Sequence, residues 1–395
     1  MGKYNFDEIV DRKITKCRKW DNKILKEKFG LDSDAIPMDI ADMDFKSPPE
    51  VVNAIVERAK LGVYGYTYTY DKYYEAVIEW NKRRFNVDLK KDWITLTFGT
   101  VSTLHYIVQA FCRKEDKVMI NTPAYDPFRE ATLRQNCKLV YSTLKNINNR
   151  YFLDFEDIEN KFKNEDIKIF IFCSPQNPSG RVWSKEEINK LSELCIKYKV
   201  LLVSDEIHRD VIFKKGKFTT LWNANESICN NSIVCVSPNK GFNLGGLKSS
   251  YIIIKDRKIR ETLKKRLEMN SITSPHVFAE PALIAAYTKG EEWLKELTEY
   301  VNMNFQVLEK AIKEKFPKAK FMKPESSFLA WIDMREEFKS EDEIREFFTR
   351  ANVTVVYGSY FVKDGEGFIR INVGCPRKIL KEAINRINNT EKLSD

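Results

Sequence analysis

The most informative stretch of the chain is Ile233-Val-Cys-Val-Ser-Pro-Asn-Lys-Gly-Phe-Asn-Leu-Gly-Gly-Leu-Lys248. Its apolar beginning predicts a buried strand, and the glycines and asparagines that follow predict a loop at the end of that strand. A lysine in such a place, here Lys240, can lose its proton at moderate pH and condense with an aldehyde. The chain has 66 Lys and Arg residues, so Lys240 is informative only through its surroundings.

Short β-branched runs alternate with helical patterns on both sides of this stretch. The predicted strands are Trp93–Phe98, Val118–Asn121, Lys168–Cys173, Val200–Ser204, Ser232–Ser237 and Ser250–Ile254. Residues 101–111 and 186–198 carry apolar side chains at helical spacing. This alternation is typical of an α/β domain whose largely parallel sheet is covered by helices on both faces.

The C-terminal part of the chain has a different character. It begins with a long charged helical stretch and continues with three predicted strands and one helix, at Gly290–Phe316, Phe328–Asp333, Val353–Val356, Gly367–Asn372 and Ser340–Arg350. We therefore expect a large α/β domain over residues 46–288 and a small α+β domain over 289–395. We expect residues 1–45 to pack with the small domain.

Composition limits the class of protein. The 395 residues are 43% hydrophobic and 31% charged, as in soluble globular proteins. The eight cysteines form no CxxC pair, and the N-terminus lacks the apolar core of a signal peptide, so we expect a cytoplasmic protein. The net charge of +9 is spread along the chain without a nucleic-acid-binding signature, and no stretch approaches the ~20 apolar residues of a membrane span. Neither nucleic acid nor membrane is an expected partner.

Three loops at predicted strand ends carry polar or aromatic groups. The turn at Gly99 joins a strand to a helix and offers free N–H groups to an anion, or is an ordinary helix start. Tyr125, between Pro123 and Pro127, is either a stacking platform for a planar ring or part of a rigid packed loop. Prolines and a glycine around Asn177 either aim its amide inward or form a structural turn.

Asp205 follows a buried strand, where an unpaired carboxylate is costly. A magnesium site would require a GxxxxGK[ST] loop, which the chain lacks, so no metal is expected. The other candidate partner is a cationic ring nitrogen, because a buried carboxylate keeps such a nitrogen protonated and makes the ring an electron sink. Ser237 and Lys248, on either side of Lys240, could reach a phosphate held by the turn at Gly99.

Ligands bind at the carboxyl ends of strands in open α/β sheets, where these groups are all predicted to lie. Together they supply an anion cradle, a stacking ring, a polar contact, a carboxylate for a ring nitrogen and an amine for an aldehyde. Pyridoxal 5′-phosphate (PLP) is the common cofactor that asks for all five. We therefore predict a PLP enzyme whose cofactor forms a Schiff base with Lys240.

Eight motifs spread along nearly the whole chain carry a family resemblance. They are Lys19-Trp20-Asp21, Ala41-Asp42-Met43-Asp44-Phe45, Tyr64-Gly65-Tyr66-Thr67, Thr122-Pro123-Ala124-Tyr125, Ser174-Pro175-Gln176-Asn177-Pro178, Ser204-Asp205-Glu206-Ile207-His208, Asn243-Leu244-Gly245-Gly246-Leu247-Lys248 and Arg370-Ile371-Asn372-Val373-Gly374-Cys375-Pro376. On these motifs the chain resembles the fold-type I PLP-dependent enzymes, which are aspartate aminotransferase-like members of the class I/II aminotransferase superfamily. Within them it is most similar to the MalY/PatB group of C–S β-lyases.

The resemblance implies a role for each residue around the cofactor ring. Lys240 would carry the cofactor and then remove the Cα proton of the substrate. Asp205 would pair with the pyridinium nitrogen, and Tyr125 would stack on the ring. Asn177 would hydrogen-bond the ring hydroxyl and lie beside the substrate, and His208 would either touch the same oxygen or simply pack.

The resemblance also implies a phosphate site and a shared dimer. The backbone of Thr100 and Val101, with Ser237 and Lys248, would hold the phosphate. Tyr66 would reach the phosphate of the neighbouring subunit in a homodimer with shared active sites, or it is one more tyrosine in an aromatic-rich loop.

Arg370 would bind the substrate α-carboxylate as a bidentate fork, the alternative being a surface ion pair. Two positions depart from the family pattern. Asp39 replaces a tryptophan near the expected substrate mouth, and Asn239 replaces a serine before the lysine.

The implied reaction is α,β-elimination, in which cystathionine or a related cysteine S-conjugate yields a thiol, pyruvate and ammonia within methionine and cysteine metabolism. Transamination of an α-amino acid would use the same residues and is the main alternative. A binding or regulatory protein on the same scaffold is a third hypothesis.

Overall fold

The computed structural model describes residues 2–213 and 218–392. Its large sheet is built from strands β2 (Ile94–Thr97), β3 (Lys117–Thr122), β4 (Lys138–Thr143), β7 (Ile167–Cys173), β8 (Leu201–Asp205), β9 (Ser232–Val236) and β10 (Ser250–Ile253). Within the described residues these strands follow the order β2-β10-β9-β8-β7-β3-β4. Strand β10 is antiparallel to both neighbours and the remaining pairs are parallel, which confirms the predicted sheet. Strand β4 was not predicted.

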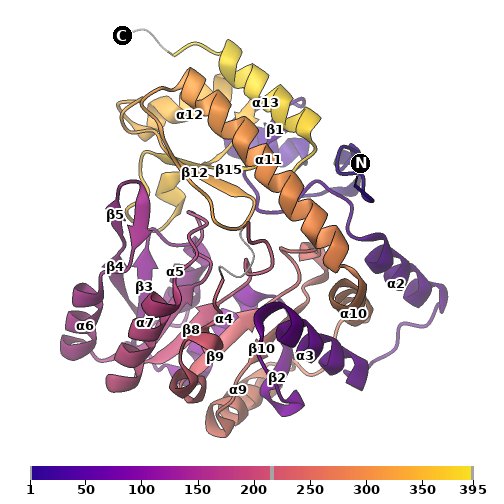
Figure 1. The fold of residues 1–395 in the computed structure, drawn as a ribbon, viewed down its shortest axis with the longest axis vertical. Coiled ribbons are helices and arrows are strands. Elements are labelled where there is room, and N and C mark those ends of the chain that lie inside the picture. Colours follow the sequence, from indigo (N-terminus) through magenta and orange to yellow (C-terminus); the bar gives the residue numbers. More distant parts are fainter. Residues whose placement is uncertain (1, 214–217, 393–395) are drawn as a thin grey trace.

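Helices cover both faces of this sheet (Figure 1). One face packs against α4 (Thr100–Phe111), α5 (Asp126–Leu133) and α9 (Arg257–Met269), and the other against α3 (Asp71–Phe85), α7 (Lys185–Lys197), α8 (Leu221–Ala224) and α10 (Ala279–Lys289). On β7, Ile169 and Ile171 join the first core, and Phe170 and Phe172 join the second. Successive side chains of a strand point to opposite faces, so a strand buried on both sides is a continuous apolar run.

The C-terminal part forms a separate antiparallel sheet above the large one (Figure 1). Its strands are β11 (Lys320–Met322), β12 (Leu329–Asp333), β14 (Val356–Tyr357) and β15 (Phe368–Asn372), and its helices are α11 (Glu291–Lys315), α12 (Glu341–Arg350) and α13 (Arg377–Asn389). The strand order is β11-β12-β15-β14. Helix α11 directly follows α10 and so links this sheet to the large domain.

The expected single strand Val353–Val356 is wrong. The structure divides it into β13 (Val353–Thr354), which pairs in parallel with β1 (Ile36–Pro37), and β14, which pairs with β15. Buried Val355 separates the two strands. One β-branched run therefore serves two sheets, a division that a pattern of residue types does not reveal.

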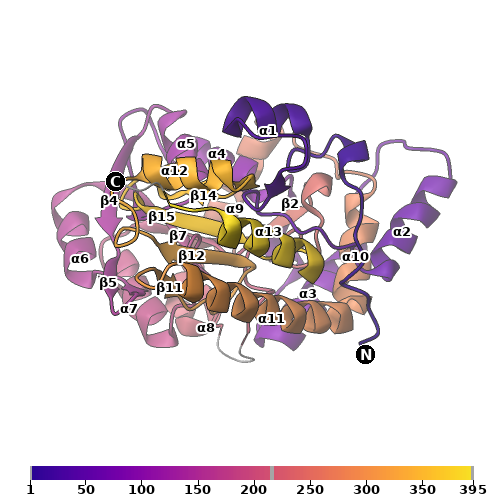
Figure 2. The same ribbon diagram turned by 90° about the horizontal axis from the view of Figure 1, so that it is seen from above.

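The N-terminal segment lies against the C-terminal part, as Figure 2 shows from above. The segment contains α1 (Asn22–Phe29), capped by the Asp21 carboxylate, which accepts hydrogen bonds from the backbone N–H groups of Lys23 and Ile24. Helix α2 (Pro49–Lys60) follows, and α6 (Phe155–Asn164) and the hairpin of β5 (Lys145–Ile147) and β6 (Arg150–Phe152) lie further along the chain. The boundaries 1–45, 46–288 and 289–395 stay a prediction.

In the described ranges, no helix is both long enough and apolar enough to span a bilayer.

Candidate active site

A cavity of about 410 Å³ opens at the carboxyl ends of the central strands. It is lined by eight of the residues expected at the site, namely Thr100, Val101, Tyr125, Asn177, Asp205, His208, Lys240 and Lys248. They come from the carboxyl ends of β2, β3, β7, β8 and β9 and from the segments that follow these strands. Strand β2 points the same way as β9 because each is antiparallel to β10. These loops therefore share one edge of the sheet, which explains why residues distant in sequence meet here.

Lys240 and Asp205 both line this cavity, Asp205 from a buried position and Lys240 from a partly buried one. Burial lowers the pKa of the Lys240 amine to about 8, and its Nζ donates a hydrogen bond to the Ala41 carbonyl oxygen. Burial also raises the pKa of the Asp205 carboxyl to about 7, although its Oδ1 accepts a 3.2 Å hydrogen bond from the Ile207 backbone N–H. A carboxyl group in this state fits a cationic ligand nitrogen, which would favour its ionised form.

His208 is a second residue of the cavity whose side chain could bind a polar ligand. Burial lowers the pKa of its imidazole to about 3, so the ring is neutral. Its Nδ1 is buried and has no hydrogen-bond partner in the part of the chain that the structure describes. A buried polar atom without a partner is costly, and a ligand oxygen in the cavity would satisfy it.

One end of the cavity suits an anion. Helix α4 begins there without a side-chain cap, after Gly99 with a φ of 90°. A Cβ atom on Gly99 would lie 3.7 Å from the Lys248 Cδ, so the lysine side chain passes close to this turn. Free N–H groups at a helix start together with a lysine fit a phosphate.

Arg370 lies on β15, just outside the cavity lining, and is buried rather than part of a surface ion pair. Its Nη1 donates a 2.9 Å hydrogen bond to the Asn177 Oδ1, and its Nη2 donates a 3.1 Å bond to the Asp39 carbonyl oxygen. Its Nε has no partner among the described residues, and none of their carboxylates lies within ion-pair distance of the guanidinium. Burial lowers the pKa of Arg370, so a carboxylate ligand would be favourable there.

Ser237 and Tyr66 do not line the cavity. The Ser237 hydroxyl donates a 2.5 Å hydrogen bond to the Ser249 carbonyl oxygen and accepts one of 3.0 Å from the Asn239 backbone N–H. Ser237 thus shapes the loop that carries Lys240. Tyr66 is fully exposed. Their expected contacts with phosphate stay predictions.

Both departures from the family pattern have definite places. Asp39 is buried outside the cavity lining, and its Oδ1 accepts a 2.8 Å hydrogen bond from the Thr354 hydroxyl. Asn239 lines the cavity, with an Oδ1 that has no partner in the described ranges. Asp39 therefore stabilises the backbone near Arg370 in this structure, whereas Asn239 faces the ligand space.

Several lining residues were missed from the sequence, among them Ala41, His105 and Phe128. His105 follows Val101 by one helical turn, and helical spacing could have revealed it. Ala41 belongs to one of the motifs of the resemblance, but no local signal predicts its place in the cavity, which it reaches from an N-terminal loop.

The fold is that of the class I and II aminotransferases. The sequence pattern of the family Aminotransferase class I and II matches residues 33–387, and the chain belongs to this family.

Three relatives show which members of the family this chain is similar to. Cystathionine β-lyase PatB of Bacillus subtilis (strain 168) is 36% identical over 384 residues, which cover 97% of this chain and 98% of PatB. The PLP-bound C–S lyase from Staphylococcus hominis is 35% identical, with a TM-score of 0.91 over 98% of this chain and 97% of that one. Cystalysin from Treponema denticola, whose structure contains a pyridoxal 5′-phosphate cofactor, is 31% identical, with a TM-score of 0.93 over 98% of each chain. The predicted fold-type I architecture and the resemblance to the MalY/PatB group are confirmed.

Proposed function

We propose that this protein is a PLP-dependent C–S β-lyase that cleaves cystathionine or a related cysteine S-conjugate into a thiol, pyruvate and ammonia. One observation carries the proposal: the amine of Lys240, with its lowered pKa, and the carboxyl of Asp205, with its raised pKa, line the same cavity. The similarity to PatB and to the Staphylococcus hominis C–S lyase supports the lyase reaction and the cofactor.

The residues present fit PLP in chemical type. Backbone N–H groups of Thr100 and Val101, with Lys248 and Ser237, would hold the phosphate. Tyr125 would lie against the ring, and Asn177 and His208 would meet its hydroxyl group. When bound, the cofactor supplies an electron sink for negative charge at the substrate Cα.

Three side chains would perform the proton and binding steps. The carboxylate of Asp205 would hold a proton on the ring nitrogen, because ionised Asp205 gains a cationic partner in its buried place. Arg370 would orient the substrate by binding its α-carboxylate. The Lys240 amine would hold the cofactor and then accept the proton from Cα, as its pKa near 8 suits a base at neutral pH.

The balance of the reaction is simple. The Cβ–S bond of the substrate breaks, the sulfur leaves with a proton as a thiol, and addition of one water releases pyruvate and ammonia. Transamination begins with the same proton removal, so the family's name as aminotransferases keeps it as the second candidate.

We also propose a cytoplasmic homodimer that acts in methionine and cysteine metabolism. Full exposure of Tyr66 supports a role for this side chain outside its own subunit, at the phosphate of a partner subunit.

The decisive experiment is to give the purified protein L-cystathionine without any keto-acid acceptor and to measure pyruvate. Pyruvate formation that is lost in Lys240→Ala supports the lyase. Amino transfer that requires an acceptor, without pyruvate, would replace the lyase by the aminotransferase. Borohydride reduction followed by peptide mass mapping tests Lys240 as the attachment point.

A further inference from the structure

We propose that the buried ion pair between Lys19 and Asp44 is a positioning device for Lys240. It would act through the strap, by which we mean residues 39–45, and would hold the Ala41 carbonyl oxygen against the Lys240 amine. A role of this ion pair in catalysis rests on the proposed function. Its effect on the protonation of the Lys240 amine does not.

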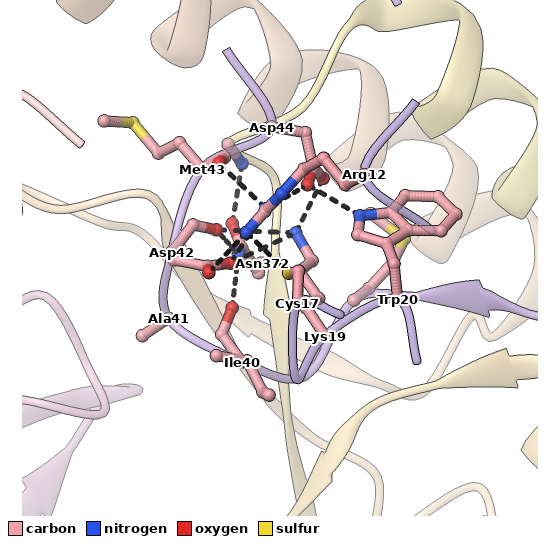
Figure 3. A network of polar contacts seen from close by, with 12 residues as sticks. Arg12, Cys17, Lys19, Trp20, Ile40, Ala41, Asp42, Met43, Asp44 and Asn372 are labelled. Atoms are coloured by element: carbon pink, nitrogen blue, oxygen red, sulfur yellow. Dashed lines mark hydrogen bonds and ion pairs between the residues drawn. The ribbon is translucent and has the colours of Figure 1, made fainter. Parts of the chain in front are cut away.

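Asp44 is the centre of the network in Figure 3. Its Oδ2 lies 2.7 Å from the Lys19 Nζ, and the two side chains are 3% and 1% exposed. Its Oδ1 accepts hydrogen bonds of 2.6 Å from the Arg12 Nη1 and 2.8 Å from the Trp20 Nε1. One buried carboxylate thus receives three donors from the N-terminal segment, which fixes the end of the strap.

A buried ion pair of this kind is a poor way to stabilise the fold alone. Removing Lys19 and Asp44 from water costs free energy that an apolar pair would not cost. Buried ionic groups are retained in some proteins because they specify one geometry. In this chain these groups set the position of the strap, whose Ala41 carbonyl oxygen accepts a hydrogen bond from the Lys240 Nζ.

The strap is fixed on its other side by two asparagines. The Asn243 Nδ2 donates to the carbonyl oxygens of Met43 and Phe45 at 2.9 and 2.8 Å, and its Oδ1 accepts a 3.1 Å bond from the Met43 N–H. The Asn372 Nδ2 donates to the carbonyl oxygens of Ile40 and Asp42, both at 2.6 Å.

These asparagines belong to the two elements that carry the chemistry. Asn243 lies three residues after Lys240 in the same loop, and Asn372 lies two residues after Arg370 on β15. The strap also contacts Arg370 directly, through the 3.1 Å bond from its Nη2 to the Asp39 carbonyl oxygen. The strap therefore connects the proposed base to the proposed carboxylate-binding residue.

Within the strap, two groups act on the amine. The Ala41 carbonyl oxygen accepts a hydrogen bond from the Lys240 Nζ, which favours the charged ammonium form. The Asp42 carboxylate, held at 2.8 Å by the Arg12 Nη2, also raises the pKa of Lys240 and opposes the larger lowering by burial. Neither Lys19 nor Asp44 lines the cavity, so they are positioning residues rather than catalytic ones.

The test measures the protonation of Lys240 without turnover. Full-length protein freed of cofactor is labelled with trace acetic anhydride between pH 6 and pH 11, and the acetylation of Lys240 is quantified by peptide mass mapping. In Asp44→Asn the strap loses the carboxylate that three donors of the N-terminal segment hold, and only its bonds to Asn243 and Asn372 remain. The Ala41 carbonyl oxygen is then held less firmly against the amine and stabilises the ammonium form less. We expect the midpoint for Lys240 to fall by about one pH unit.

Asp333→Asn is the matched control. Asp333 is also a buried aspartate, and its Oδ2 lies 2.6 Å from the Arg335 Nη2, but among the described residues neither side chain hydrogen-bonds to the strap. The control variant should keep the midpoint of the parent protein. If Asp44→Asn does not fold, as judged by circular dichroism, Trp20→Phe removes one donor to Asp44 and should lower the midpoint in the same direction by a smaller amount.

The proposal would be overturned if the Lys240 midpoint were unchanged or raised in folded Asp44→Asn or, where that variant does not fold, in Trp20→Phe. It would also be overturned if the midpoint fell as far in Asp333→Asn as in the test variant. Failure of the parent protein to make pyruvate would refute the lyase but would leave this result valid, because the labelling uses no substrate.

Discussion

Arg370 and Asn177 are joined by a 2.9 Å hydrogen bond from the guanidinium Nη1 to the amide Oδ1. The two residues come from different sheets, since Arg370 lies on β15 and Asn177 follows β7. A side chain that would contact the cofactor is thus coupled to one that would bind the substrate carboxylate. Loss of Arg370 should therefore affect both ligands.

Arg370→Lys should raise KM for L-cystathionine on the order of 100-fold, with a smaller fall in kcat. Lysine cannot form the fork, nor can one ammonium maintain the arginine's bonds to Asn177 and to the Asp39 carbonyl oxygen. Steady-state kinetics of pyruvate release give both constants. Arg335→Lys, at an arginine that pairs with Asp333 away from the cavity, serves as control. Equal KM values for Arg370→Lys and the parent would refute the assignment.

Asp205 should make the stability of the cofactor-free protein depend on pH. Its folded-state pKa of about 7 lies above the ordinary value of 3.8, so the folded state binds the proton more tightly. This contribution is fully present below pH 3.8 and is lost as pH rises toward 7. Between pH 5 and pH 7 the free energy of unfolding should fall by about 2 kcal/mol more in the parent than in Asp205→Asn.

Urea unfolding at the two pH values measures this difference. Identical pH dependence in both proteins would mean that burial does not perturb Asp205, and the proposed pairing with a ring nitrogen would lose its physical basis.

Capture of PLP by the cofactor-free protein should accelerate as pH rises through about 8. The neutral amine attacks the aldehyde, and burial lowers the pKa of Lys240 to about 8. Stopped-flow absorbance at a series of pH values gives the midpoint, and Lys240→Ala should show no fast capture. A midpoint near 10.5, as for an exposed lysine, would contradict the role of burial.

Mixing two defective variants tests the shared site of the proposed dimer. Lys240→Ala and Tyr66→Phe should each lose most activity, because one lacks the base and the other lacks a phosphate contact across the dimer. After the subunits are dissociated and reassociated in equal amounts, half of the dimers should contain one intact site, so about a quarter of the parent activity should return.

The matched control uses Tyr68→Phe, which changes another exposed tyrosine of the same loop and should keep full activity alone. Mixed activity no greater than the mean of the separate variants would place Tyr66 outside the partner's site.

The sequence predicted the central strands well because burial on both faces leaves a plain signal. Strand β7 is apolar at every position but Lys168, and β8 and β9 are buried along their whole length. Edge strand β4 contains exposed Lys138 and Thr143 and was missed for that reason. The run Val353–Val356 was assigned to one strand because residue type does not record a change of sheet.

The site was predictable where a strand end places a residue. Asp205 and Lys240 follow directly from the rule that ligands bind at the carboxyl ends of parallel strands. Ala41 could not be found in this way, because long-range bonds from Asn243 and Asn372 to its neighbours in the strap bring it to the cavity. The sequence of the strap does not indicate that it contacts these two residues.

The pairing of β1 with β13 has a consequence for how the protein is made. Ile36 leaves the ribosome early, yet its partner Val353 is translated more than 300 residues later. The nascent chain must therefore keep its first segment undocked until nearly all of it has emerged, and the pocket around Lys240 is completed as one of the last events of synthesis.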